Sequence, residues 1–283
     1  MFESRSAERY PKPKAGAARR RPNAGEAGKP RELGADRTLG CRHELKYHIA
    51  ESKAVAVARF VSPFLQLDRY CKLQRSGDYP IVSLYVDSED LQLCRESLRG
   101  HKNRFKLRIR SYTDDPDYPR FFEIKRRLNT IIIKSRARVM DYDVPALLAG
   151  RSLPPQDYTA DVKTIDQFQF YMNSIRARPV VLVRYMRQAY EGDSHNRVRV
   201  TFDRHLAYNV TRLPEVRLGG SGWRQNPYTV NGVVLEIKYT GHFPVWLSEM
   251  VRYFDLRQQS ISKYASSIRE SCSLRFCAPQ LGA

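Results

Sequence analysis

The stretch that decides the fold is Lys106-Leu107-Arg108-Ile109-Arg110, in which basic and apolar residues alternate. Successive side chains of a β-strand point to opposite faces. Leu107 and Ile109 therefore share one face, and the three basic residues share the other. The sequence predicts a strand here with one face for a hydrophobic core and one face that carries positive charge.

The same alternation recurs elsewhere in the chain. It is found in Glu44-Leu45-Lys46-Tyr47, Glu123-Ile124-Lys125, Arg197-Val198-Arg199-Val200 and Glu236-Ile237-Lys238. A single strand of this kind is an ordinary surface strand, whereas five or more in one chain can line a shared charged cavity. A cavity lined by many cations and a few carboxylates suits a polyanion and its metal ion.

Hydrophobic periodicity and turn residues predict about eight strands. We expect these strands near residues 43–49, 81–86, 104–112, 120–126, 131–139, 180–190, 197–205 and 232–239. Helices are expected at 51–64, between Ser88 and Gly100, and at 166–176, 246–254 and 262–269. Short connections favour antiparallel pairing, and eight antiparallel strands can close around one ligand. The predicted fold class is α+β, an antiparallel eight-stranded β-tunnel or barrel with flanking helices.

Charge and composition predict a tail and one large domain. The 283 residues carry a net charge of +19, and residues 1–40 hold ten Lys or Arg and five Asp or Glu. Residues 1–40 lack apolar periodicity, so we expect a disordered basic tail there, the barrel domain over 41–272 and a second tail over 273–283. Because most of the positive charge lies in the predicted domain, an anionic partner is expected.

Several other functional classes lack support in the sequence. The five cysteines show no zinc-site spacing, and we expect reduced thiols in a cytoplasmic protein. No apolar run approaches the roughly 20 residues of a membrane-spanning helix. The chain contains no P-loop, protein-kinase or GxGxxG motif. Most aromatic residues fall on apolar strand faces and not beside the basic ones, so no nucleic-acid partner is expected.

The basic strand residues are the candidate anion ligands. Arg108 and Arg110 project to the same side, about 6–7 Å apart, which suits two neighbouring phosphoryl groups. Further candidates are Lys46, Lys125, Arg187, Arg199 and Lys263. The alternative is that these residues form solvated strand faces.

Three glutamates are the candidate metal ligands. Glu44, Glu123 and Glu236 each stand two residues before a lysine on the same strand face. Mg²⁺ and Mn²⁺ prefer oxygen ligands and often bind through one or two carboxylates plus phosphate oxygens. Glu236 is the first choice, and the alternative for all three is a cross-strand ion pair with Lys or Arg.

An ordered set of motifs resembles the catalytic domain of the vacuolar transporter chaperone (VTC) family. The motifs are Arg42-His43-Glu44-Leu45-Lys46-Tyr47, Ser83-Leu84-Tyr85-Val86-Asp87, Lys106-Leu107-Arg108-Ile109-Arg110, Phe122-Glu123-Ile124-Lys125, Tyr185-Met186-Arg187-Gln188-Ala189-Tyr190, Arg199-Val200-Thr201-Phe202-Asp203, Leu235-Glu236-Ile237-Lys238-Tyr239 and Ser262-Lys263-Tyr264. The resemblance runs from about Arg42 to Arg269. It implies a triphosphate tunnel metalloenzyme fold, and polyphosphate synthesis from ATP with a divalent metal, commonly manganese.

The resemblance also implies roles for particular residues. The expected catalytic residues are Lys46, Arg108, Arg110, Lys125 and Lys263. The expected substrate ligands are Lys106, Lys134, Arg187, Arg199 and Ser262. The expected ligands of Mn²⁺ or Mg²⁺ are Glu236, Glu44 and Glu123. One departure from the wider superfamily is that Arg42 takes the first glutamate position of the ExExK signature, which replaces a metal ligand by a cation and weakens the case for a two-metal hydrolase.

The expected function is transfer of the terminal phosphoryl group of a nucleoside triphosphate, with ATP as first choice, to a growing polyphosphate chain. The alternatives are a tripolyphosphatase or nucleoside triphosphatase of the same fold, and a non-catalytic polyphosphate or nucleotide sensor. By this resemblance, we expect no counterpart here of the N-terminal regulatory domain and the membrane spans that accompany the eukaryotic enzyme. Coupling to transport, and any location at a membrane, would therefore need a separate membrane-protein partner.

Overall fold

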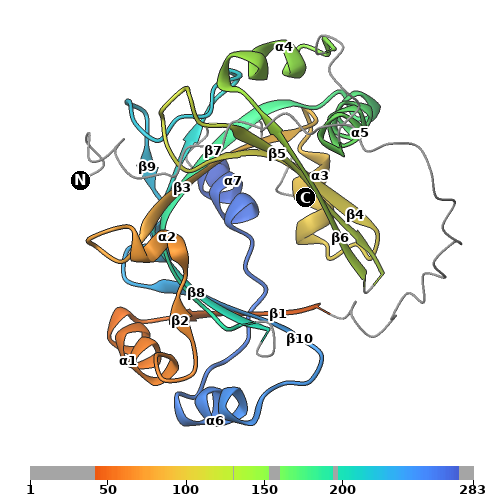
Figure 1. Ribbon diagram of the computed structural model, residues 1–283. Coiled ribbons are helices and arrows are strands. Elements are labelled where there is room, and N and C mark those ends of the chain that lie inside the picture. Colours follow the sequence, from red (N-terminus) through yellow and green to blue (C-terminus); the bar gives the residue numbers. More distant parts are fainter. Residues whose placement is uncertain (1–41, 130, 153–159, 194–196, 274–283) are drawn as a thin grey trace, which may run out of the picture.

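A computed structural model describes residues 42–129, 131–152, 160–193 and 197–273 (Figure 1). The main strands are β1 (Arg42–Ile49), β3 (Tyr79–Asp87), β4 (Arg104–Ser111), β5 (Arg120–Leu128), β6 (Ile131–Val139), β7 (Arg178–Glu191), β8 (Val198–Val210) and β10 (Val233–Thr240). Two short strands, β2 (Gln66–Leu67) and β9 (Arg224–Gln225), pair with β7 and β8. The tails expected outside the domain lie outside the described residues, apart from Ser273.

The strands form one antiparallel sheet with the order β1-β10-β8-β7-β3-β4-β5-β6. The sheet is curled into a half-barrel, and β1 and β6 are the two ends of its hydrogen-bonded path (Figure 1). Lys125 on β5 reaches across the curl to Glu44 on β1, with 3.1 Å between Nζ and Oε2. The predicted α+β class with eight antiparallel strands is confirmed, and side chains bridge the interior of the curl.

Helices cover both the outer and the inner face of the sheet. They are α1 (Glu51–Val61), α2 (Arg69–Lys72), α3 (Gln92–Leu98), α4 (Val144–Leu148), α5 (Ala160–Ser174), α6 (Val245–Tyr253) and α7 (Lys263–Ser273). Helices α1 and α6 share a core with β1, β8 and β10, while α4 and α5 share another with β4–β6. Helix α7 lies within the curl and shares a third core with β3 and β7 (Figure 1).

A buried aspartate ties α3 and α7 to the end of β3. The Asp87 carboxylate accepts hydrogen bonds from the backbone N–H groups of Leu93 and Cys94 in the first turn of α3. Its Oδ2 also accepts a 2.5 Å hydrogen bond from the Tyr264 hydroxyl on α7. Ser88 Oγ accepts a further hydrogen bond from Gln92 N at the start of the helix.

The expected elements and the observed ones differ at a few ends. Helix α5 begins at Ala160, six residues before the expected start, and Ile165 in its second turn is already part of the core. Strand β8 continues to Val210, five residues beyond the expected end. A bulge near His205, whose φ is 54°, interrupts the alternation that the sequence pattern relies on.

Two further expectations concern cysteines and membranes. Cys71 and Cys94 are free and buried, but Cys272 is disulfide-bonded, so the expectation of reduced thiols is wrong for that residue. Among the described residues, no helix combines the length and the apolar character needed to cross a membrane.

The packing of α5 on the sheet gives a stability prediction. Phe168 is fully buried and packs edge-on against Phe122 on β5, with 4.9 Å between ring centroids. Phe168→Ala should lower the free energy of unfolding by about 3–5 kcal/mol, because it removes a buried ring and leaves a cavity. Phe170→Ala on the same helix should cost under about 0.5 kcal/mol, because that ring is 69% exposed. Urea unfolding checks both, and equal losses would contradict the assignment of the two faces of α5.

Candidate active site on the concave face

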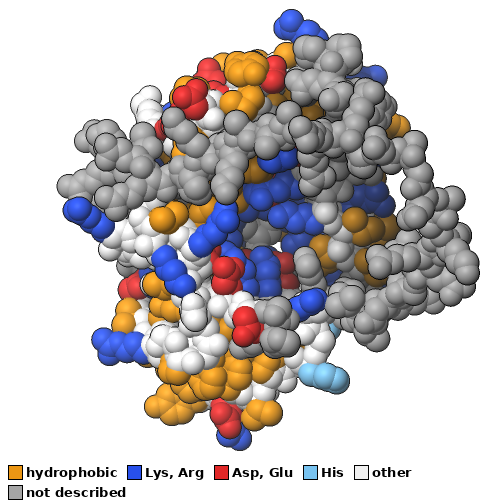
Figure 2. Space-filling view, viewed as in Figure 1, with side chains coloured by type: hydrophobic (Ala, Val, Ile, Leu, Met, Phe, Trp, Pro, Cys, Tyr) orange, Lys and Arg blue, Asp and Glu red, His pale blue; other side chains and the backbone are white. Residues whose placement is uncertain are grey.

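The concave face of β4, β5 and β6 carries rows of charged residues that lie opposite one another. One row is Arg108, Glu123 and Arg136, and the next is Lys106, Lys125 and Lys134. The apolar residues between them, such as Leu107 and Ile124, point outward into the core beneath α5. Figure 2 shows Lys and Arg side chains gathered around the central hollow, with Asp and Glu among them.

Glu123 is the centre of the first ion-pair cluster. Its side chain is 1% exposed, and Oε2 lies 2.7 Å from Arg108 Nε and 3.8 Å from Arg110 Nε. Oε1 lies 3.1 Å from Arg136 Nε and 3.2 Å from Lys134 Nζ. Burial alone would raise the pKa of Glu123, but the four cations hold it far below its ordinary value. The structure thus shows the ion-pair alternative that was considered for this glutamate.

Glu44 and Glu236 form a second cluster on the adjacent strands β1 and β10. Glu44 lies 2.8 Å from Lys46 Nζ and 3.1 Å from Lys125 Nζ. Glu236 Oε1 lies 2.8 Å from Lys238 Nζ. Burial raises the pKa of Glu236, but the surrounding cations, Lys238 foremost, hold it well below its ordinary value. Burial and the charge of Glu236 raise the pKa of Glu44, but the neighbouring lysines hold it below its ordinary value. Both carboxylates are therefore ionised near neutral pH.

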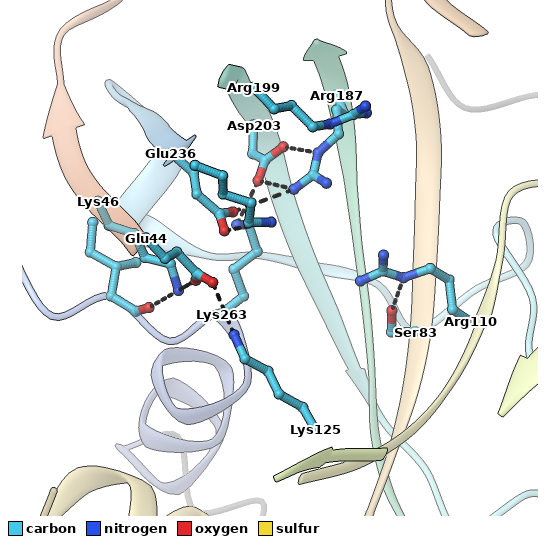
Figure 3. A network of polar contacts seen from close by, with 12 residues as sticks. Glu44, Lys46, Ser83, Arg110, Lys125, Arg187, Arg199, Asp203, Glu236 and Lys263 are labelled. Carbon is cyan, nitrogen blue, oxygen red and sulfur yellow. Dashed lines mark hydrogen bonds and ion pairs between the residues drawn. The ribbon is translucent and has the colours of Figure 1, made fainter. Parts of the chain in front are cut away.

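Asp203 on β8 forms the third cluster, with Arg187 and Lys263 (Figure 3). Its two oxygens accept from Arg187 Nε at 2.7 Å and Nη2 at 2.8 Å, and Oδ2 lies 2.6 Å from Lys263 Nζ. Arg187 Nη2 is also 3.8 Å from Glu236 Oε2. The second and third clusters therefore meet, and Lys263 at the start of α7 is held beside them.

The segment before α7 brings two more expected residues to the same place. Lys106 Nζ donates to Ser262 Oγ at 3.0 Å, and Lys46 Nζ donates to the Ile261 carbonyl at 3.2 Å. Ser262 Oγ in turn accepts from Ala265 N in the first turn of α7. The last helix and the residue before it therefore contribute Lys263 and Ser262 to a site otherwise made by strands.

Arg199, an expected substrate ligand, forms its ion pairs with carboxylates outside the three clusters. Its guanidinium group pairs with Asp68, at 2.7 Å from Nη2 to Oδ2, and with Glu191. Asp68 also caps α2, where its Oδ1 accepts from Cys71 N. Arg199 still lies on the same strand face as Asp203, but its charge is balanced by carboxylates outside the expected set.

Sequence reasoning did not select three residues that the structure places in the clusters. They are Asp203, Lys238 and Arg136. Each stands two or four residues from an expected residue on the same strand face, so strand alternation carried the signal. The motif Arg199-Val200-Thr201-Phe202-Asp203 contains Asp203, yet a lone carboxylate among cations gave no reason to choose it.

The carboxylates of this face are the oxygen ligands available to a divalent metal. Among the described residues, no group of three His, Cys, Asp or Glu side chains could hold a metal ion. Glu44, Glu123 and Glu236 therefore do not form a three-carboxylate centre. Glu44 and Glu236 are close enough for their charges to interact, and Mg²⁺ or Mn²⁺ commonly binds through one or two carboxylates plus substrate phosphates. The donor set fits a metal that arrives with, or is completed by, phosphate oxygens.

The VTC domain family matches residues 41–271, and the chain belongs to this family. This match confirms the resemblance found in the motifs. The chain matches none of the curated proteins with which it was compared.

Solved structures with a similar fold have low sequence identity to this chain. A Hippeastrum protein studied as an adenylyl cyclase, with a dominant triphosphatase activity, is 12% identical, with 80% of this chain and 95% of that chain covered and a TM-score of 0.46. A candidate adenylate cyclase from Bacillus halodurans is 12% identical, with coverages of 77% and 92% and a TM-score of 0.45. A Pyrococcus horikoshii OT3 protein is 13% identical, with coverages of 82% and 99% and a TM-score of 0.40.

The protonation of Lys106 should change when a polyanion binds. Burial, aided by neighbouring cations, lowers the pKa of Lys106 to about 7, so this amine is mostly neutral at pH 8. A bound polyanion favours the charged amine and raises its pKa. Binding of tripolyphosphate at pH 8 should therefore take up about one more proton in the wild type than in Lys106→Met. At pH 6 the amine is already protonated, and the difference should vanish.

Calorimetry in two buffers of different ionisation enthalpy measures this uptake. Lys102→Met, which removes an exposed lysine, is the matched control. Equal proton uptake by the wild type and Lys106→Met at pH 8 would contradict the assignment of a neutral Lys106.

Proposed function

We propose that this protein is a metal-dependent polyphosphate polymerase, which transfers the terminal phosphoryl group of a nucleoside triphosphate, with ATP as first choice, to a polyphosphate chain. Membership of the VTC domain family supports activity on polyphosphate or triphosphate compounds. The finer assignment to chain synthesis rests on the balance of charges on the concave face.

The observation that carries the proposal is the excess of cations over carboxylates on this face. The cations are Lys46, Arg108, Arg110, Lys125, Lys134, Arg136, Arg187, Lys238 and Lys263, to which Lys106 adds a charge when it is protonated, and the carboxylates are Glu44, Glu123, Asp203 and Glu236. Cations in such excess need an anionic ligand with many charges. Two phosphate compounds held together, a donor and an acceptor, meet that need.

The charge balance also favours phosphate over water as the acceptor. A terminal phosphate oxygen is ionised at neutral pH, so its attack needs positioning and charge neutralisation but no general base. Water would need a carboxylate free to accept its proton. Among the described residues of this face, each of the four carboxylates is ion-paired with at least one cation.

Individual residues have distinct parts in this proposal. Arg108 and Arg110 would bind neighbouring phosphoryl groups and stabilise the charge that develops during transfer, while Glu123 keeps their side chains in place. Lys263 and Ser262 would hold the phosphate chain from the side of α7. A divalent metal bound by Glu236 and Glu44 would neutralise charge on phosphate oxygens near the leaving group.

The first test is chain synthesis by the purified protein. With ATP, Mn²⁺ and a short phosphate primer, the wild type should produce a ladder of long chains on a polyphosphate-stained gel. Lys46→Ala and Arg108→Ala should each reduce synthesis by about 10²–10³-fold, because each removes a cation that stabilises transferring phosphate. Arg252→Ala, on the exposed face of α6, should have no effect.

The products distinguish the proposal from its alternatives. Release of orthophosphate without chains would contradict it in favour of a triphosphatase of the same fold. Tight binding of polyphosphate without turnover, independent of metal, would favour a sensor. Full activity of Arg108→Ala with unchanged stability would remove this residue from the site.

The metal has a separate test. Glu236→Gln keeps the shape of the side chain but removes its negative charge. It should weaken Mn²⁺ binding by at least about tenfold in the presence of a non-hydrolysable nucleoside triphosphate analogue. Mutation of a residue that only hydrogen-bonds to a metal ligand already lowers metal affinity by about 10–100-fold, so loss of a ligand charge should have at least that effect. Electron paramagnetic resonance of free Mn²⁺ measures the affinity directly. Glu249→Gln on α6 is the control, and an unchanged affinity in Glu236→Gln would exclude Glu236 as a ligand.

A further inference from the structure

The rows of cations on β4 and β5 continue beyond the residues discussed so far. Toward the β5–β6 hairpin, the row after Lys106 and Lys125 consists of Arg104 opposite Arg127. Strand alternation places both on the concave face, because Arg104 is two residues before Lys106 and Arg127 two residues after Lys125. The third strand adds Ile132 to this row and no charge.

The two arginines of this row lack the close carboxylate contacts that the other rows have. Among the described residues, no ion pair is found for Arg104 or Arg127. Arg104 Nη1 donates to the His101 carbonyl, and Arg127 Nε donates to the Asn129 carbonyl at 2.8 Å. Burial and the charge of Arg127 lower the pKa of Arg104, while the charge of Glu96 on α3 raises it in part, so the two arginines repel each other and Glu96 offsets some of that repulsion. Like charges directly opposite on neighbouring strands destabilise a sheet.

At the other end of the same three strands, the cations have aromatic and carboxylate partners. There the row is Arg110, Phe121 and Arg138. The Arg136 guanidinium lies 3.9 Å from the centroid of Phe121, and Arg138 pairs with Asp161 on α5. Aromatic faces and an ion-paired carboxylate therefore accompany the cations at this end, whereas at the hairpin end Arg104 and Arg127 form no ion pair with any described residue.

We propose that Arg104 and Arg127 form an exit subsite, which binds the already polymerised part of a long polyphosphate chain as it leaves the concave face past the β5–β6 hairpin. This inference rests on the proposed function, which places the transfer step beside Glu236 and Arg108. Rows two residues apart along a strand are about 6.6–6.8 Å apart, so the four rows from Arg110 to Arg104 extend for about 20 Å. A long chain can contact all four rows, but a triphosphate bound beside Arg108 does not reach the last one.

The test compares binding of two ligands that differ in length. The variant is Arg104→Gln/Arg127→Gln, and the matched control is Arg59→Gln/Arg252→Gln, which removes two exposed arginines from α1 and α6. Without ATP, the variant should bind long-chain polyphosphate about tenfold more weakly, and the salt dependence of binding should fall by a slope of about 1–2, as expected for two lost phosphate contacts. Its affinity for tripolyphosphate should stay within about twofold of wild type, and the control should match wild type for both ligands.

Each other outcome overturns the exit subsite. Unchanged affinity for the long chain would show that the arginine pair does not contact it. An equal loss for both ligands would place the pair in the transfer site or in the fold. Circular dichroism and the single variant Arg127→Gln, at an exposed position, separate these two causes. Single-stranded RNA bound as tightly as polyphosphate, with the same loss in the variant, would mean a general polyanion surface.

A synthesis assay separates failure of the subsite from failure of the proposed function. If the wild type makes chains, the variant should consume ATP at the same initial rate on a short primer but yield shorter products. If the wild type makes no chains from ATP and yet shows the length-selective binding, the polymerase is refuted while the long-chain site is supported. Wild-type chain synthesis with products of equal length in the variant would refute the exit subsite alone.

Discussion

The structure depends on how positive charge is kept inside a curled sheet. Removing a cation from water is costly unless a counter-charge lies beside it. Here three buried carboxylates, Glu123, Asp203 and Glu236, each serve two or more cations, so a few anions hold a wall of arginine and lysine in place. The cations on this face outnumber the carboxylates, so an anionic ligand would balance the positive charge that remains.

The second requirement is that α7 stays inside the curl. Its anchor is the hydrogen bond from Tyr264 to Asp87, and the Tyr264 ring also stacks on Tyr85, with 4.6 Å between centroids. Tyr85 in turn accepts a hydrogen bond from Arg108 at 3.3 Å. The position of the last helix and the orientation of a central arginine are therefore linked through two tyrosine rings.

Sequence alternation predicted the eight main strands and nearly all the charged side chains of the concave face, because a strand with apolar residues on one side leaves little choice for the other. The short elements α2, α4, β2 and β9 were not predicted, since segments of two to five residues carry no periodicity. Asp203 was missed because its importance depends on Arg187 and Lys263, and Lys263 is distant in sequence. A cross-strand ion pair was one alternative for Glu123, but the sequence could not show that cations from both neighbouring strands, β4 and β6, enclose it, because that depends on register.

The site joins the first strand to the last helix, and this has a consequence for the timing of folding. Lys46 and Glu44 lie on β1, whereas Lys263 begins α7 and Ser262 directly precedes it, more than two hundred residues later. A chain still emerging from the ribosome can form β3–β6 with their cations, but it lacks the elements that complete the hollow. Until synthesis passes α7, the nascent protein exposes a basic surface that other cellular polyanions can occupy.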